Sequence, residues 1–157
     1  MSEFDPPSAS ERGSVVLGAI GMRALAQVLD AIVVGIPTLV FLLAMGLSPL
    51  EENLTDNELL WITVVGVGVA LVYNTVAIGV WGTTIGKRIC GLKVVNRVDG
   101  GAVSMNYAAV RALVPTVVQL VPVIGPGLAI VVYLRAFFHP MRQGLHDAAA
   151  GTVVVKR

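Results

Sequence analysis

The sequence predicts an all-α membrane protein with three to four transmembrane or partly inserted helices, and with a small cytoplasmic β-hairpin between the second and third helices. Three observations lead to this prediction. Hydrophobic residues make up 55% of the 157 residues and charged residues only 13%, whereas a soluble domain carries about 25% charged residues. The hydrophobic residues lie in long runs, and Lys and Arg are unevenly distributed between the segments that connect these runs.

The first 14 residues differ from the rest of the chain in being polar. They are rich in Ser, Pro, Glu and Asp, a composition that favours a disordered tail. They lack the basic region and the short apolar core of a signal peptide. We therefore expect the membrane domain to cover residues 15–157.

Two hydrophobic runs predict the first two helices, over about residues 24–47 and 59–80. Roughly 20 residues cross the hydrocarbon core of a bilayer, so both runs are long enough. The second run is uncharged, and Trp61 and Trp81 bracket it, about 30 Å apart on a helix. Tryptophan favours the boundary between water and lipid. The alternative, a helix buried in a soluble core, is disfavoured because so short a chain cannot surround two such helices.

The third hydrophobic region, residues 103–138, has two interpretations. It is either one span over residues 112–134, or two shorter segments over about residues 105–121 and 124–138. The sequence VPVIGPG lies between the two shorter segments, and proline and glycine at this density indicate a turn. Segments this short are expected to tilt little or to enter the bilayer only part-way.

The distribution of charge favours the two shorter segments. Residues 48–58 hold four acids and no Lys or Arg, whereas the loop 82–104 and the chain after residue 134 hold four basic residues each. Basic residues remain on the cytoplasmic side of a membrane. We therefore expect a multi-pass protein of the inner (plasma) membrane, with the loop 82–104, the tail 139–157 and both termini in the cytoplasm.

The cytoplasmic loop carries the signal for the β-hairpin. β-Branched residues flank Asp99-Gly100-Gly101, a typical hairpin turn. The C-terminal sequence GTVVVKR also reads as a strand, which could join the hairpin. An irregular loop is the alternative.

Polar residues inside the hydrophobic runs predict a buried polar layer. If Arg23 marks the cytoplasmic boundary, Asp30 lies seven residues inward, about 10 Å deep. Asn74 and Arg111 lie equally far from the expected ends of their helices, and Arg135 is within reach. A lone charge in the bilayer core costs roughly 2.5–3.5 kcal/mol, so we expect Asp30 to pair with Arg111. The layer is either a site for an ion, proton or small solute, or an ion pair that only fixes helix packing.

Several residues are expected at the membrane boundary. Trp61 and Trp81 are interface anchors, and Lys87 and Arg88 are expected to contact anionic headgroups of the bilayer. Cys90 lies near this boundary, where it is either modified or packed, and packing is the simpler interpretation.

The sequence shows no catalytic constellation, so we expect no enzyme. His146 and Asp147 are adjacent, and adjacent residues on a helix point in different directions. His139 is the only other histidine, so no metal site is expected. No cofactor motif is present, and the basic residues do not gather with aromatics as in nucleic-acid-binding proteins.

Three sequence segments resemble the RDD family of bacterial membrane proteins, which is named for an arginine and two aspartates. MRALAQVLDAIVV contains Arg23 and Asp30, RQGLHDAAAGTVVV contains Asp147, and TIGKRICGLKVV resembles the segment after the family's second helix. The resemblance covers about residues 21–155. It implies a small multi-helix membrane protein, and transport has been suggested for the family.

Three functions follow as hypotheses. Transport of ions, protons or a small solute would need a homo-oligomer, because three or four helices are too few to enclose a transport pathway. Small residues at Gly66, Gly68 and Ala70 permit close helix approach. The second hypothesis is a non-catalytic accessory or scaffold subunit of a larger membrane complex. The third and weakest is a lipid-directed enzyme that uses His146 and Asp147.

Overall fold

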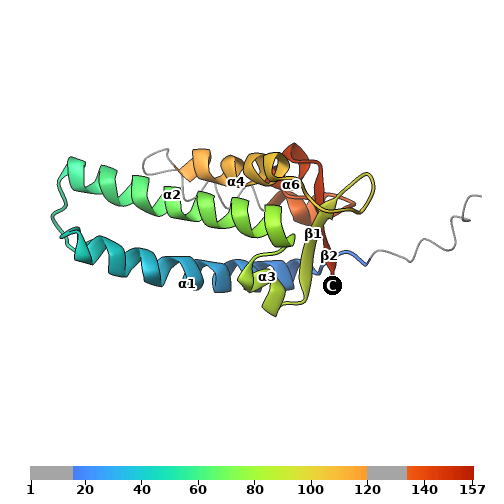
Figure 1. Ribbon diagram of the computed structural model, residues 1–157, viewed down its shortest axis with the longest axis horizontal. Coiled ribbons are helices and arrows are strands. Elements are labelled where there is room, and N and C mark those ends of the chain that lie inside the picture. Colours follow the sequence, from blue (N-terminus) through green and yellow to red (C-terminus); the bar gives the residue numbers. More distant parts are fainter. Residues whose placement is uncertain (1–15, 120–133) are drawn as a thin grey trace, which may run out of the picture.

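Two long antiparallel helices form the body of the protein. The computed structural model describes residues 16–119 and 134–157; the predicted disordered tail over residues 1–14 lies outside these ranges. Helix α1 (Ile20–Ala44) and helix α2 (Asp56–Trp81) lie side by side along the length of the molecule (Figure 1). Both are long and apolar enough to cross a membrane. They extend beyond the predicted residues 24–47 and 59–80 at one or both ends.

The ends of these helices are set by local sequence. Thr55 and Glu58 form a capping box at the start of α2, in which the Glu58 N–H donates to Thr55 Oγ1 and the Thr55 N–H donates to Glu58 Oε2. At the end of α1, Gly46 has a φ of 78°, and the Leu47 N–H donates to the Leu42 carbonyl at 2.9 Å. This is a Schellman motif, which turns the chain toward α2.

Helix α4 (Met105–Gln119) packs along α2 and starts where α2 ends. A Cβ atom at Gly79 would lie 2.6 Å from Met105 Sδ, so the glycine permits this close approach. Residues 134–138 are helical, and Met141 then packs against the strands found at the same end. The described ends of this hydrophobic region, Met105 and Met141, therefore lie at the same end of the molecule. The predicted segment 124–138 lies partly outside the described residues.

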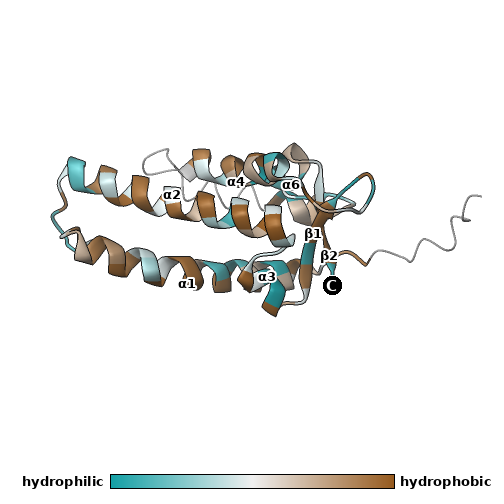
Figure 2. Cartoon of the chain, in the orientation of Figure 1, coloured by the Kyte–Doolittle hydropathy of each residue, from teal (hydrophilic) through white to brown (hydrophobic). Residues whose placement is uncertain are grey.

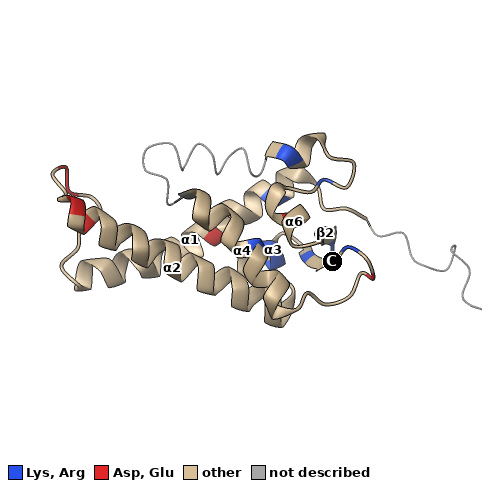
Figure 3. Ribbon diagram, turned by 90° about the horizontal axis from the view of Figure 1, so that it is seen from above, with Lys and Arg blue, Asp and Glu red and all other residues tan. Residues whose placement is uncertain are grey.

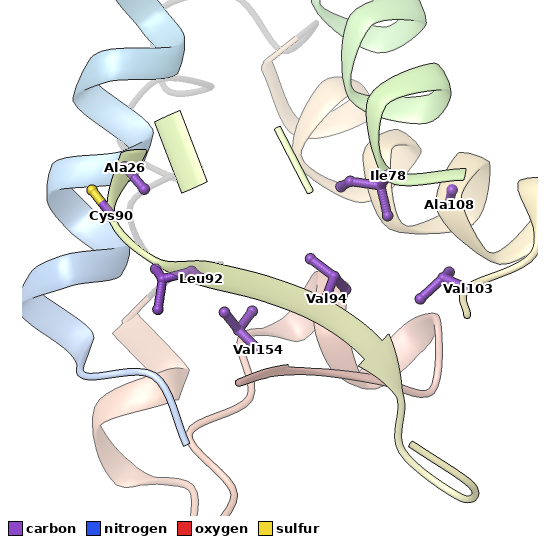
Figure 4. Close-up of a cluster of buried hydrophobic side chains, with 8 residues drawn as sticks. All are labelled: Ala26, Ile78, Cys90, Leu92, Val94, Val103, Ala108 and Val154. Atoms are coloured by element: carbon purple, nitrogen blue, oxygen red, sulfur yellow. The ribbon is translucent and has the colours of Figure 1, made fainter. Parts of the chain in front are cut away.

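A small assembly of short helices and strands, which we name the cap, covers the end where α1 and α4 start. It consists of α3 (Ile85–Ile89), β1 (Leu92–Asn96), α6 (Leu145–Ala149) and β2 (Thr152–Lys156). Strands β1 and β2 pair antiparallel, with Val94 opposite Val154. Figure 4 shows Val94 pointing toward Ile78 of α2, and Leu92 and Val154 belong to the same buried cluster, together with Ala26 of α1. The main hydrophobic core thus lies at the joint between the cap and the helices.

The prediction of a β-hairpin between the second and third helices is wrong. The turn itself forms, because Gly100 has a φ of 67° and the Asn96 N–H donates to the Gly101 carbonyl. The residues that follow do not form a strand; Val103 enters the core instead. The partner of β1 is the C-terminal strand, whose prediction is confirmed. Pairing of β1 with β2 is favoured because it places Val153, Val154 and Val155 in buried positions.

Hydropathy and charge follow the long axis of the molecule. Apolar residues cover the lengths of α1 and α2 (Figure 2), and many large ones face outward, including Ile36, Val40 and Val72. Acidic residues mark the turn between α1 and α2, and most basic residues lie at the cap end (Figure 3). An apolar outer surface between two polar ends is typical of a protein embedded in a bilayer.

Candidate functional site

Asp30 of α1 is buried at the joint with the cap and is surrounded by hydrogen-bond donors. Its Oδ1 accepts from the Tyr73 hydroxyl and from the Gly86 N–H, both at 2.8 Å. Its Oδ2 accepts from Thr84 Oγ1 at 2.5 Å and from Lys87 Nζ at 3.5 Å. We refer to these five residues as the Asp30 cluster. Two donors on each oxygen leave the carboxylate with little capacity for another ligand.

The segment Thr84–Lys87 is shaped to make these contacts. Thr84 caps α3, and its Oγ1 accepts from the Lys87 N–H and from Lys87 Nζ. The Tyr73 hydroxyl accepts from the Ile85 N–H while it donates to Asp30. At Gly86, an added Cβ would lie 2.2 Å from the Ala26 carbonyl oxygen. Only glycine therefore lets α3 pack directly against α1.

Lys87 is buried in this cluster, and its side chain is only 8% exposed. Burial lowers the pKa of Lys87 to about 8, with a further contribution from the positive charge of Arg111, and Asp30 offsets part of the effect. The prediction that Lys87 contacts lipid headgroups is therefore wrong, since its ammonium group faces Asp30. Arg88, the next residue, is exposed.

A second cluster forms around Asp147 at the start of α6. Its Oδ1 lies 2.8 Å from Arg111 Nη2, and its Oδ2 lies 3.8 Å from Arg23 Nη1 and accepts from the Gly144 N–H at 3.1 Å. His146 Nε2 lies 3.6 Å from Asp147 Oδ1. We name these residues the Asp147 cluster. The expectation that His146 and Asp147 point apart is wrong, because both turn inward from the short α6.

The two arginines also hold the C-terminal part of the cap. Arg23 donates from Nη1 to the Arg142 carbonyl and from Nη2 to the Val154 carbonyl. Arg111 Nη1 lies 3.4 Å from Thr152 Oγ1. Guanidinium groups from α1 and α4 therefore fasten α6 and β2 to the helices.

Burial and charge act in opposite directions on the Asp147 pKa. Burial alone would raise it, but Arg111, His146, the Gly144 N–H and Arg23 outweigh that effect and lower the pKa. The pKa of His146 is lowered to about 3, chiefly by burial and also by the nearby cations. Asp147 is thus ionised and His146 neutral near pH 7.

The residues of the predicted polar layer do not form one group, because Asp30, Arg111 and Asn74 each interact with a different partner. Asp30 pairs with Lys87, and Arg111 pairs with Asp147, so the expected Asp30–Arg111 pair is wrong. Asn74 donates to the Ala70 carbonyl of its own helix. Arg135 is half-buried and belongs to neither cluster as described above.

Sequence reasoning missed Tyr73 and Thr84 as partners of Asp30. Tyr73 precedes Asn74 and so lies at about the same depth in its helix, which could have indicated it as a partner. The Thr-x-Gly-Lys sequence of residues 84–87 could have indicated Thr84. Trp61 and Trp81 are both exposed on α2. Cys90 is buried in the core, which matches the packed interpretation.

A cavity of about 370 Å³ lies between α1, α2, α4, α6 and the helical residues after 133. Charged and polar residues line its cap end, namely Arg23, Lys87, Arg111, His146 and Asp147. Farther into the bundle the described walls are mainly apolar, with Val28, Ala70, Pro115 and Leu134, and they also include the uncharged polar side chains of Gln27, Asn74 and Thr116. Asp30 is not among the residues that line it. Its volume falls within the range of small-molecule sites, about 300–1,000 Å³.

The described residues of this site do not include a group of side chains suited to bind a metal ion. In residues 16–119 and 134–157, no three His, Cys, Asp or Glu side chains gather in a way that could hold a metal ion. The cations of the cavity favour anionic groups instead, since Arg and Lys only donate hydrogen bonds.

The fold and the two clusters define a helical membrane protein whose cap is fastened by buried ion pairs. The RDD family profile matches residues 17–151, and the chain belongs to the RDD family. Of the three residues that the resemblance marks, Asp30 and Asp147 are the carboxylates of the two clusters, and Arg23 contacts Asp147. The chain is 34% identical over 135 residues to "Uncharacterized protein YckC" of Bacillus subtilis (strain 168), covering 85% of this chain and 80% of that protein. No solved structure matches the chain.

Proposed function

We propose that this protein transports a small solute across the plasma membrane as a homo-oligomer, and that the cavity is its solute-binding site. The cavity supports the proposal because it combines buried charges with apolar walls between helices that are long enough to span the bilayer. Buried ionisable residues within a membrane bundle are characteristic of solute and ion pathways.

The proposed orientation places the cap and both termini in the cytoplasm. The concentration of Lys and Arg at the cap end and of acids at the opposite turn supports this orientation. The solute would then enter the cavity from the cytoplasmic side or leave toward it.

Asp30 is assigned a structural role in this proposal. Its two oxygens already accept from four donors, and it does not line the cavity. A group that moves an ion must exchange its partners, and Asp30 has no readily exchangeable one. The solute site therefore centres on Arg23 and Arg111.

A homo-oligomer would supply the walls that a single chain lacks. Gly66 and Gly68 lie on α2, and a Cβ at either position would meet no atom of residues 16–119 or 134–157 within 4 Å. This part of α2 is open to a second copy, and small residues allow membrane helices to approach closely.

Flux into vesicles tests the proposal. Purified protein in liposomes would be assayed for the movement of protons, Na⁺, K⁺ and small organic anions, with empty vesicles as the reference. Ala112→Leu fills part of the cavity and should reduce flux at least tenfold, because Ala112 lines it. Ala109→Leu, on the same helix but outside the cavity, is the matched control and should leave flux unchanged. No flux above that of empty vesicles, from protein that retains its helical circular dichroism, would overturn transport.

A second candidate function is a non-catalytic accessory subunit of a larger membrane complex. The saturated Asp30 cluster favours it, because that arrangement fixes the cap rigidly without leaving a free functional group. This function predicts one partner protein at constant stoichiometry after mild solubilisation, and no flux by the chain alone. A homo-oligomer with measurable flux would count against it.

A further inference from the structure

We propose that the cavity binds an amphiphile with one anionic head group, a carboxylate or phosphate on a hydrocarbon chain. The head would lie against Arg23 and Arg111, and the chain would extend along the apolar walls. The inference deepens the proposed function, on which it rests for the role of the cavity, by naming the class of ligand.

The first support is an imbalance of buried charge. At the joint of the cap and the helices, three largely buried cations, Arg23, Lys87 and Arg111, face two buried carboxylates, Asp30 and Asp147. One positive charge is therefore uncompensated among the described residues of these clusters. An unpaired charge in a low-dielectric site is costly, and an anionic ligand would offset it.

The second support is a donor without an acceptor. Arg23 lines the cavity, and its Nη atoms donate to the Arg142 and Val154 carbonyls. Its Nε is buried and has no hydrogen-bond acceptor in the described part of the chain. Buried polar atoms are nearly always hydrogen-bonded in folded proteins. An anionic oxygen beside this guanidinium would supply the missing acceptor.

The third support is the polarity gradient along the cavity. On α1, the wall runs from Ile20 to Val28, eight residues and about 12 Å along the helix axis. On α2 it runs over a similar distance, from Ile78 to Ala70. Charged side chains are confined to the cap end, so a bare inorganic anion would leave the deeper apolar part unfilled. A head group with a hydrocarbon chain matches both parts, in the orientation that lipids adopt in a bilayer.

Ligand retention by the purified protein tests this inference. The whole chain in a nonionic detergent at pH 7 would be incubated separately with dodecanoate, dodecyl phosphate, dodecyltrimethylammonium and inorganic phosphate. After gel filtration, bound ligand would be counted by mass spectrometry. We expect about one dodecanoate or dodecyl phosphate per chain, and at least tenfold less of the other two probes. Dodecanoate alone would identify a fatty-acid type of ligand, and dodecyl phosphate alone a phospholipid type.

Two variants make the test specific to the cavity. Ala112→Leu should lower retention of the anionic amphiphiles at least tenfold, while Ala109→Leu should retain them as the wild type does. Circular dichroism and a monodisperse gel-filtration peak would establish that both variants fold. Equal retention of dodecyltrimethylammonium, equal retention of inorganic phosphate, or unchanged retention in Ala112→Leu would each overturn the inference.

The two proposals fail in different ways. Retention of an anionic amphiphile without any flux would overturn transport and leave the ligand assignment standing. Flux of another solute by protein that retains no anionic amphiphile would overturn the ligand assignment and leave transport standing.

Discussion

The Gly86 N–H donates a 2.8 Å hydrogen bond to Asp30 Oδ1, although the two residues are 56 positions apart in the chain. The same glycine lies so close to α1 that a Cβ would be 2.2 Å from the Ala26 carbonyl oxygen. Asp30 and Gly86 together therefore set the distance between α1 and α3. The contacts of Thr84 and Lys87 with Asp30 depend on that distance.

Gly86→Ala should destabilise the protein by about 1–3 kcal/mol, the usual cost of forcing extra volume into a packed site. The methyl group would displace α3 and weaken its bonds to Asp30. The measurement is the thermal unfolding midpoint in detergent. Gly21→Ala in α1 is the matched control, because a Cβ there meets no atom within 4 Å in the described part of the chain, and it should be neutral or stabilising. Equal midpoints for the two variants would contradict this packing argument.

A double-mutant cycle should show that Asp30 is coupled to Lys87 and not to Arg111. Breaking a buried ion pair costs about 3–5 kcal/mol because one charge is left unpaired. We expect Asp30→Asn and Lys87→Met to be far from additive in the free energy of unfolding. Asp30→Asn and Arg111→Met should be nearly additive. A larger coupling energy for Asp30 with Arg111 than for Asp30 with Lys87 would show that Asp30 interacts with the partner expected from the sequence.

His146 should make the protein less stable as the pH falls from about 6.5 toward 3. Its folded-state pKa is lowered from 6.5 to about 3 by burial, so in this window the unfolded chain binds a proton that the folded chain does not. The loss should reach about 3 kcal/mol at pH 4, at about 1.4 kcal/mol per pH unit.

The free energy of unfolding of His146→Gln, measured from pH 7 to pH 4, should fall less steeply than that of the wild type. His139→Gln, which alters the half-buried histidine outside both clusters, should retain the wild-type slope. A wild-type slope in His146→Gln would show that other groups carry the acid sensitivity.

Arg111→Gln should release the C-terminal strand from the helices. The variant loses the 2.8 Å contact with Asp147 and the contact with Thr152, so amide hydrogen exchange should rise in β2 while α2 remains protected. Exchange measured by mass spectrometry would check this. Arg88→Gln, which alters an exposed arginine in α3 of the cap, should leave β2 protected. Equal exchange in the two variants would mean that strand pairing alone holds β2.

Cysteine labelling should locate the two ends of the molecule on opposite sides of the membrane. Glu51→Cys lies in the acidic turn and Val98→Cys in the exposed turn of the cap, whereas the native Cys90 is buried. With a membrane-impermeant maleimide added outside intact cells, Glu51→Cys should react and Val98→Cys should not. The reverse pattern would invert the proposed orientation.

Much of the fold could be predicted, because it follows from local properties of the chain. The two long helices follow from runs of apolar residues, and the two polar ends follow from the separation of acidic and basic loops. The strand at residues 152–156 was also predictable from its β-branched residues. The short helices α3 and α6 were not, since five-residue helices carry no periodic signal.

The sequence identified several residues of the site correctly, but it did not predict which of them pair with each other. Asp30, Arg111 and Asp147 were identified as important, but the depth argument paired Asp30 with the wrong cation. The basic pair Lys87-Arg88 predicted a contact with headgroups at the membrane surface, whereas α3 turns back and brings the Lys87 ammonium group to Asp30. Depth along separate helices says nothing about how a connecting segment folds over them.

The sequence by itself determined that the two long helices are apolar enough to cross a membrane, and that polar groups gather at their two ends, because hydropathy and charge are properties of each residue. Only the tertiary structure decided that Lys87 pairs with Asp30, that Arg111 pairs with Asp147, and that β1 pairs with the C-terminal strand. These choices depend on distances between segments remote in the chain. At Gly86, the absence of one Cβ atom allows two such segments to meet.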